Sequence, residues 1–308
     1  QGQVAVGEGA MSTLRSPIKY FGGKGNMTAK LLPLIPYRHV YVEPFGGGAS
    51  VLLAREPSPV ECFNDVDGGL VNLFKVLADP ALFETFYRRV ALLPYSRQLY
   101  NEAREKCASK EEILQDDLVE WAVAWFVMAR QNFGGMAGKT GWGFAVKGST
   151  KGMAGEVAKW LSALENLPAI HARLQRVQVE RRDWRFILDT YDTPETVFYL
   201  DPPYVPETRT NTKYANELIQ ADHIELVERM LALRGYAVLS CYGHPVYEPL
   251  ERAGWLKSEF QTVCHAAGRT RTSKLQGKGA VLKHAPRTEV VWRSPNCQDK
   301  RPCQGSLI

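Results

Sequence analysis

A short apolar run that ends in an acid and two prolines constrains the fold more than any other part of the sequence. Residues 197–200 are apolar and predict a buried parallel strand, and Asp201-Pro202-Pro203-Tyr204 follows them directly. Open α/β sheets bind ligands at the carboxyl ends of their strands, so this acid is expected at a binding site. The prolines fix the backbone and remove N–H donors, which leaves nearby carbonyls free to accept hydrogen bonds. Carboxylate, carbonyl and tyrosine ring together predict a clamp for a planar amino group, such as the exocyclic amine of a nucleobase.

The rest of the chain alternates between strand and helix patterns, which is typical of α/β proteins. Apolar runs predict strands at residues 39–44, 60–63, 177–179, 196–200 and 236–241. Patterns with helical spacing predict helices at residues 49–55, 67–77, 184–189 and 217–233. Two later segments, 259–264 and 289–292, predict a closing antiparallel pair.

Residues 79–175 interrupt this alternation. They carry helical, polar patterns and then a stretch with many glycines at turn positions. We interpret them as an inserted domain, so that residues 14–78 and 176–295 together form the main α/β domain. Residues 1–13 are expected to be a disordered or foreign extension, and residues 296–308 a tail.

Three further motifs lie near the first two predicted strands. The glycines of Glu43-Pro44-Phe45-Gly46-Gly47-Gly48 let the backbone approach a ligand, although an ordinary tight turn explains them equally well. Asn64-Asp65 ends the second strand, where an acid accepts bonds from ribose hydroxyls or caps the next helix. Lys19-Tyr20-Phe21-Gly22-Gly23-Lys24 precedes the first strand and suits an anionic group. Together these motifs favour a ligand that contains a nucleoside.

In this order, with the insertion before Asp201-Pro202-Pro203-Tyr204, the motifs resemble those of Dam-type DNA adenine methyltransferases. The resemblance is to the alpha arrangement, in which the cofactor motifs precede the target-recognition domain and the catalytic motif follows it. It covers about residues 16–295. The resemblance implies a Rossmann-like, seven-stranded methyltransferase sheet with an inserted, mostly helical target-recognition domain. It also implies S-adenosylmethionine as cofactor and adenine in double-stranded DNA as substrate.

The resemblance also assigns roles to individual residues. Asp65 is expected to hold the ribose, and Asp183-Trp184 matches the acid and aromatic that cup the cofactor adenine, where the family's usual aromatic is Phe. The residues expected to bind the cofactor are Tyr20, Gly22, Gly23, Lys24, Glu43, Pro44, Phe45, Gly46, Gly47, Gly48, Asp65, Asp183, Trp184 and Asp201.

The catalytic residues are expected to be Asp201, Pro202, Pro203 and Tyr204. The Asp201 carboxylate can only accept hydrogen bonds. With the Pro202 carbonyl it is expected to orient the adenine amino group, while Tyr204 stacks on the base. The amino group cannot be reached inside a duplex, so the base must be flipped out at a cost of a few kcal/mol.

Contacts to DNA are predicted in three places. Lys19 lies beside the cofactor motif, and Gln131, Asn132, Lys139 and Trp142 belong to the turn-rich part of the insertion, where amide and basic side chains suit base readout. Arg269, Arg271, Lys274 and Lys278 lie in a basic loop that suits phosphate contacts. For each of these residues a polar loop exposed to solvent is the alternative.

Composition sets wider bounds. The net charge is only +5, but residues 265–287 contain six Lys or Arg and no Asp or Glu, which favours a polyanionic partner. No apolar run is long enough for a membrane span, and the scattered cysteines predict neither a metal site nor disulfides. A cytoplasmic enzyme, bacterial or encoded by a phage, is expected.

Two other functions stay open from the sequence. The same fold can methylate cytosine, RNA or a protein amide, and the chain can be a DNA-binding module without catalysis. The order of the motifs favours adenine. The DNA recognition sequence, the oligomeric state and an accompanying restriction enzyme, as in a restriction-modification pair, are not determined by the sequence.

Overall fold

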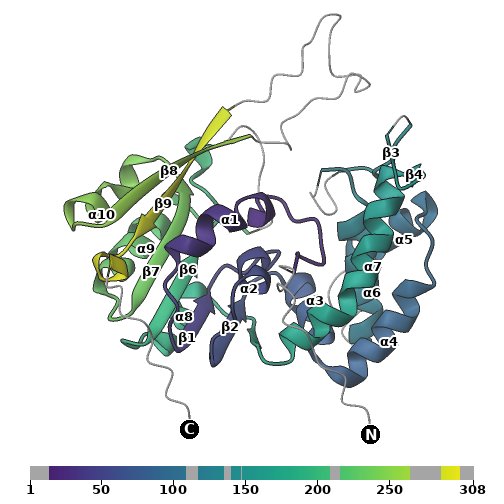
Figure 1. Ribbon diagram of the computed structural model, residues 1–308, viewed down its shortest axis with the longest axis horizontal. Helices are drawn as coiled ribbons and strands as arrows, with labels where there is room; N and C mark the ends of the chain where they lie inside the picture. The colour runs from purple at the N-terminus through teal and green to yellow at the C-terminus, as the bar shows by residue number, and fades with distance from the viewer. Residues whose placement is uncertain are drawn as a thin grey trace, which may run out of the picture.

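A seven-stranded sheet forms the centre of the protein in the computed structural model (Figure 1). The structure describes residues 14–108, 117–134, 140–146, 148–208, 216–263 and 286–298. The strands of the sheet are β1 (Val40–Glu43), β2 (Val60–Asn64), β5 (Gln178–Glu180), β6 (Thr196–Leu200), β7 (Tyr236–Tyr242), β8 (Leu256–Val263) and β9 (Pro286–Arg293). They lie in the order β5-β2-β1-β6-β7-β9-β8, and β9 runs antiparallel to both of its neighbours. The predicted Rossmann-like methyltransferase sheet is thereby confirmed.

The central strand β6 shows why such apolar runs form buried strands. Each of its five residues is buried. Side chains alternate between the two faces of a strand, and accordingly Val197 and Tyr199 belong to one hydrophobic cluster while Phe198 and Leu200 belong to another. Both faces of this strand are buried, so apolar residues are favoured at every position and the apolar run is continuous.

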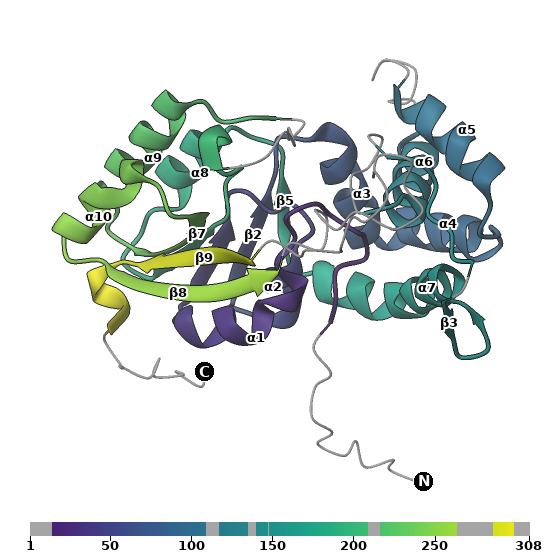
Figure 2. The same cartoon turned by 90° about the horizontal axis from the view of Figure 1, so that it is seen from above.

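Helices cover both faces of the sheet (Figure 2). On one face lie α1 (Thr28–Leu31) and α2 (Ser50–Ala54), and on the other lie α8 (Trp184–Tyr191), α9 (Gln220–Ala232) and α10 (Glu248–Arg252). Short 3-10 helices complete this part, namely η1 (Lys24–Asn26), η2 (Leu32–Leu34), η4 (Pro206–Thr208), η5 (Pro245–Tyr247) and η7 (Pro295–Gln298). No helix in the described part of the chain is long and apolar enough to span a membrane.

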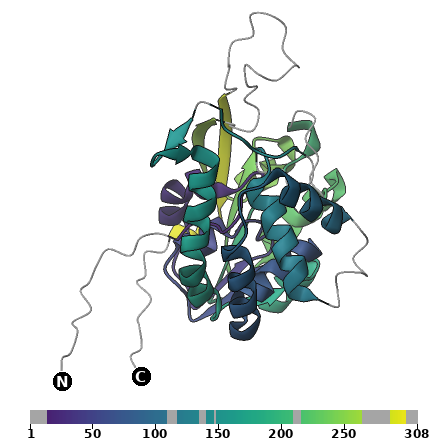
Figure 3. The same ribbon diagram turned by 90° about the vertical axis from the view of Figure 1, so that its right-hand side faces the viewer.

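The predicted insertion forms a group of helices beside the sheet, which face the viewer in Figure 3. It contains α4 (Pro80–Ala91), α5 (Arg97–Ala108), α6 (Leu118–Gln131), α7 (Gly155–Leu174) and a small hairpin of β3 (Ser149–Thr150) and β4 (Met153–Ala154). Helix α3 (Gly68–Ala78) joins this group to the sheet. A Cβ at Gly69 would lie 2.4 Å from the Trp125 ring, so this glycine lets α6 pack closely on α3.

A buried ion cluster also ties the helical group to the sheet. Arg173 of α7 donates to both carboxylate oxygens of Glu61 on β2, at 2.5 and 2.8 Å, and Arg55 donates to the same carboxylate at 3.0 Å. The Glu61 side chain is fully buried. Removing one partner of such a cluster leaves an uncompensated buried charge, which is strongly destabilising. The cluster therefore fixes one end of α7 against the sheet.

Most predicted elements differ from the structure by one or two residues at an end, and three differ by more. The helix predicted at 217–233 begins at Gln220, because Ile219 has an extended backbone and the Asp222 carboxylate accepts from its N–H at 2.9 Å. The last antiparallel pair is longer than predicted, because β8 and β9 pair along their whole length from Leu256 opposite Arg293.

Candidate active site

A cavity of about 410 Å³ opens at the carboxyl ends of β1, β2 and β6. The chain leaves β1 for β2 and β5 on one side of the sheet and later returns to β6 on the other side. Such a switch point is where open α/β sheets bind ligands, and the volume lies in the range of small-molecule sites. Every residue predicted for the cofactor lines this cavity: Tyr20, Gly22, Gly23, Lys24, Glu43, Pro44, Phe45, Gly46, Gly47, Gly48, Asp65, Asp183, Trp184 and Asp201. Pro202 and Pro203 line it as well.

The glycine turn after β1 is held by the end of β2. A Cβ at Gly46 would lie 2.2 Å from the Phe63 ring, so this glycine is required for packing inside the protein. Gly47 has a φ of +48° and donates its N–H to Asp65 Oδ2 at 3.0 Å. Asp65 Oδ1 accepts from the Asp67 N–H at 2.9 Å, and burial raises the pKa of Asp65 to about 6. Asp65 therefore shapes the turn as well as the cavity wall.

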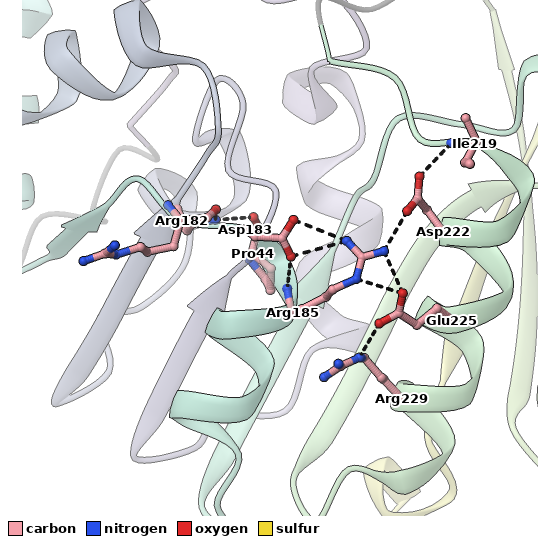
Figure 4. Close-up of polar contacts among 9 residues, drawn as sticks. Pro44, Arg182, Asp183, Arg185, Ile219, Asp222, Glu225 and Arg229 are labelled. Atoms are coloured by element: carbon pink, nitrogen blue, oxygen red, sulfur yellow. Dashed lines mark hydrogen bonds and ion pairs between the residues drawn. The ribbon is translucent and has the colours of Figure 1, made fainter.

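An ion-pair cluster with residues from α8 and α9 lies at the rim of the cavity (Figure 4). Arg185, which follows Asp183-Trp184 on α8, donates to Glu225 at 2.8 Å and to Asp222 at 2.6 Å, and lies 3.3 Å from Asp183. Because Asp222 also accepts from the Ile219 N–H, the cluster fixes the backbone at the start of α9, beside the cavity. Arg185, Asp222 and Glu225 had no predicted role.

The aromatic residue at this rim is buried. Trp184 is only 3% exposed, and the Arg185 guanidinium lies 4.4 Å from its ring centre. Its indole N–H is buried without an acceptor among the described residues. A buried donor without an acceptor is costly, and this nitrogen has almost no accessible surface, so it does not face the open cavity.

Asp201 lies at the end of β6 in a buried charge cluster. Lys24 donates to its two carboxylate oxygens at 2.7 and 2.8 Å and also lies 3.5 Å from Glu289. Burial opposes the charge on Lys24, but Asp201 and Glu289 hold its pKa well above the usual value. Burial raises the pKa of Asp201 against the opposing effect of Lys24. Lys24 therefore stays charged and anchors the carboxylate of Asp201.

Glu43 forms the floor of the cavity as a neutral acid. Tyr41 donates its hydroxyl to Glu43 Oε1 at 2.6 Å, and the side chain is buried. Burial raises the pKa of Glu43 to about 8, so the carboxyl is mostly protonated at neutral pH. Its contribution is then shape and hydrogen bonding without a negative charge.

Tyr204 lies behind the cavity wall. Its ring is 5% exposed and packs edge-on against Tyr242, with Lys24 Nζ 4.9 Å from its centre. Its hydroxyl donates to Glu289. Stacking of this ring on a target base requires an exposed ring face, and this ring is largely covered. The stacking therefore stays a prediction.

A second hollow, of about 880 Å³, lies between the N-terminal segment and α6 and α7. Basic residues line it: Arg15, Lys19, Arg130, Lys151 and Lys159. Among the described lining residues Glu156 is the only acid, and it binds Lys19 at 2.5 Å. The predicted DNA contact Lys19 therefore lies in a basic hollow, where an internal carboxylate holds it.

The structure gives Gln131 and Asn132 a different role from base readout. Both side chains are buried. Asn132 donates to the carbonyls of Met128 and Ala129, and Gln131 accepts from the Ser96 N–H and the Trp142 indole N–H. Their amide groups thus hold the end of α6 and the segment at Trp142 that lies beside it. We correct the expectation that these two side chains face DNA, because buried amides with these partners cannot reach a groove as they stand.

Trp142 belongs to a partly exposed aromatic group. It stacks on Phe144 at 6.0 Å and an interplanar angle of 13°, with the Arg97 guanidinium 4.9 Å from its ring centre. The predicted contacts Lys139, Arg269, Arg271, Lys274 and Lys278 lie outside the described residues. No group of His, Cys, Asp and Glu side chains in the described segments is arranged to hold a metal ion.

The sheet order and the cavity at its switch point define a Rossmann-like fold. The model of the D12 class N6 adenine-specific DNA methyltransferase family matches residues 20–242, more than half of the chain. The protein belongs to this family and is an enzyme that methylates adenine in DNA. A search of curated proteins found no match.

Proposed function

We propose that the protein transfers a methyl group from S-adenosylmethionine to the exocyclic amino nitrogen of adenine, in a specific sequence of double-stranded DNA. The observation that carries the proposal is the position of Asp201. Its carboxylate lies at the end of β6, fixed by Lys24, on the wall of the cavity that gathers every residue predicted for the cofactor. A fixed acceptor beside a cofactor cavity is what the orientation of an amine requires.

The residues of the cavity fit S-adenosylmethionine. Asp65 has oxygen atoms at the wall that suit ribose hydroxyls, and Trp184 contributes an aromatic side chain to the same cavity. Lys24, Gly22 and the turn at Gly46 suit the methionine end. When bound, the cofactor supplies an electrophilic methyl group on a positively charged sulfur.

The clamp residues act on the amine. The lone pair of an adenine amino group is delocalised into the ring, so the nitrogen is a poor nucleophile. Asp201 and the Pro202 carbonyl accept hydrogen bonds from the two N–H groups of the amine. These bonds favour a more tetrahedral nitrogen whose lone pair points towards the cofactor. The base reaches the clamp by flipping out of the duplex, at a cost of a few kcal/mol. We place the duplex along the basic hollow that contains Lys19, because phosphates require such a surface.

Transfer of labelled methyl groups tests this function. Duplex DNA is expected to become labelled, whereas RNA and protein offered at the same concentration stay unlabelled. Equal labelling of RNA or protein would contradict the substrate that we propose.

Asp65→Ala is expected to weaken cofactor binding by about 10-fold or more, because a hydrogen bond to a charged group is worth about 1.5–3 kcal/mol. Calorimetry with S-adenosylmethionine measures the change. Asp67→Ala is the matched control, since Asp67 caps the adjacent helix α3 through the Leu70 N–H and its loss costs about 1 kcal/mol of stability. Equal cofactor affinities in the two folded variants would contradict the assignment of Asp65 to the ribose.

Glu156→Gln is expected to tighten binding to duplex DNA. The change removes the acid from the basic hollow and releases Lys19 for a phosphate, which makes the slope of log affinity against log salt more negative by about 0.9. Fluorescence anisotropy across a salt series measures the affinity and the slope. Glu165→Gln, an exposed change on the same helix α7, serves as control. An unchanged slope in Glu156→Gln would place the DNA backbone away from Lys19.

A further inference from the structure

The antiparallel strand β9 brings a second carboxylate to the clamp. Glu289 pairs with Tyr242 at the carboxyl end of β7, so the reversed strand delivers its side chain to the edge of the sheet where the active site lies. The Glu289 side chain is only 5% exposed. A buried carboxylate needs partners that compensate its charge, and its partners here belong to the active site.

Two residues of the active site, one from the clamp and one from the cofactor cavity, meet at Glu289. Tyr204 donates its hydroxyl to Glu289 Oε1, and Lys24 Nζ lies 3.5 Å from the same oxygen. Lys24 in turn lies 2.7 Å from Asp201 Oδ1. The contacts form a chain from Tyr204 through Glu289 and Lys24 to Asp201, with one positive and two negative groups.

We propose that Glu289 is a positioning residue of the methyl-transfer step, which fixes Tyr204 and Lys24 so that Asp201 presents its carboxylate to the amine. This inference rests on the proposed function of the clamp. Without Glu289, the Lys24 ammonium would have one carboxylate partner, and it would neutralise Asp201 more completely. With Glu289 sharing that ammonium, the cluster keeps a net negative charge beside a nitrogen that gains positive charge during methylation. Fixed charges of this kind stabilise a transition state without reorganisation.

Glu289→Gln tests the inference, because glutamine keeps the shape and an oxygen for the Tyr204 hydroxyl but lacks the charge. Single-turnover methyl transfer at saturating cofactor and DNA is expected to fall by about 10-fold or more, the effect of one charged hydrogen-bonding contact. DNA affinity is expected to stay within about 2-fold of wild type, because neither Glu289 nor its partners Tyr204 and Lys24 line the basic hollow. Glu259→Gln, an exposed change on the neighbouring strand β8, is the matched control.

The pH profile separates positioning from a general loss of packing. Methyl transfer requires Asp201 ionised, so the rate declines as pH falls through its raised pKa. Removing the negative charge of Glu289 lowers that pKa, and the acid limb of Glu289→Gln is expected to move to lower pH. The other titratable groups that face Asp201 are Lys24, Glu43, Tyr199, Tyr204, Cys241 and Tyr247. None of them is changed in this variant.

Coupling to Tyr204 completes the test. If Glu289 acts through the Tyr204 hydroxyl, Tyr204→Phe and Glu289→Gln are expected to slow transfer by less in combination than the product of their separate effects. A Glu289→Gln enzyme with wild-type rate and an unmoved acid limb would overturn the inference while leaving the proposed function intact. Wild-type protein that transfers no methyl group to DNA would instead overturn the proposed function itself.

Discussion

Asp201→Ala is expected to slow single-turnover methyl transfer by about 100-fold or more at saturating cofactor and DNA. The change removes the carboxylate that accepts from the amine, and a charged hydrogen bond of about 1.5–3 kcal/mol corresponds to roughly 10- to 150-fold in rate. Loss of the aligned lone pair adds to this effect. Asp201→Asn keeps the shape but accepts more weakly, so it is expected to be severely slowed as well.

DNA binding separates loss of catalysis from loss of structure. The basic hollow does not include Asp201, so the affinity of Asp201→Ala for duplex DNA is expected to match the wild type. Asp189→Asn changes an exposed acid on α8 and is expected to leave the rate unchanged. A folded Asp201→Ala enzyme with a rate near that of wild type would contradict the clamp mechanism.

Lys24→Met is expected to lower the free energy of unfolding by about 3–5 kcal/mol, because it leaves the partly buried carboxylate of Asp201 and the buried carboxylate of Glu289 without their cation. Urea denaturation measures the loss. Lys159→Met removes an exposed ion pair on α7 and is expected to cost less than about 1 kcal/mol.

The loss of stability in Lys24→Met is expected to depend on pH. Without Lys24 the pKa values of both carboxyl groups rise further above those of the unfolded chain, so the folded state favours their protonated forms. The deficit is therefore small at acidic pH, and it grows as pH rises from the ordinary carboxyl range through the raised folded-state values. A deficit that is constant from acidic to neutral pH would contradict the pairing of Lys24 with these carboxylates.

The residues of the cavity were predictable because each motif is local in sequence. An acid after an apolar strand, as at Asp201, or a glycine turn after another, as at Gly46, lies at a strand end whatever the rest of the chain does. Parallel strands place those ends at one edge of the sheet, so separate motifs meet there. The same reasoning predicted the alternation of strands and helices, with errors at element ends and without the short helices α1 and α10.

Contacts between distant segments were not predictable in this way. Glu289 reaches Tyr204 only because β9 runs antiparallel beside β7, and Arg185 meets Asp222 only because α8 and α9 pack on the same face. The arginine directly after Asp183-Trp184 and the spacing of Asp222 and Glu225 on one helix face were the available signals. Gln131 and Asn132 were misjudged because polar side chains in a turn-rich segment suggest exposure, whereas here they satisfy buried backbone groups.

The identity of the methylated nucleoside is the most direct test of adenine methylation through Asp201. Wild-type protein is incubated with labelled S-adenosylmethionine and a long duplex DNA of mixed sequence, and the DNA is digested to nucleosides and separated by chromatography with mass detection. The label is expected in N6-methyldeoxyadenosine, and Asp201→Ala is expected to incorporate it about 100-fold more slowly under the same conditions. Label in a methylated cytosine, or equal rates of labelling by wild type and Asp201→Ala, would contradict adenine methylation through Asp201.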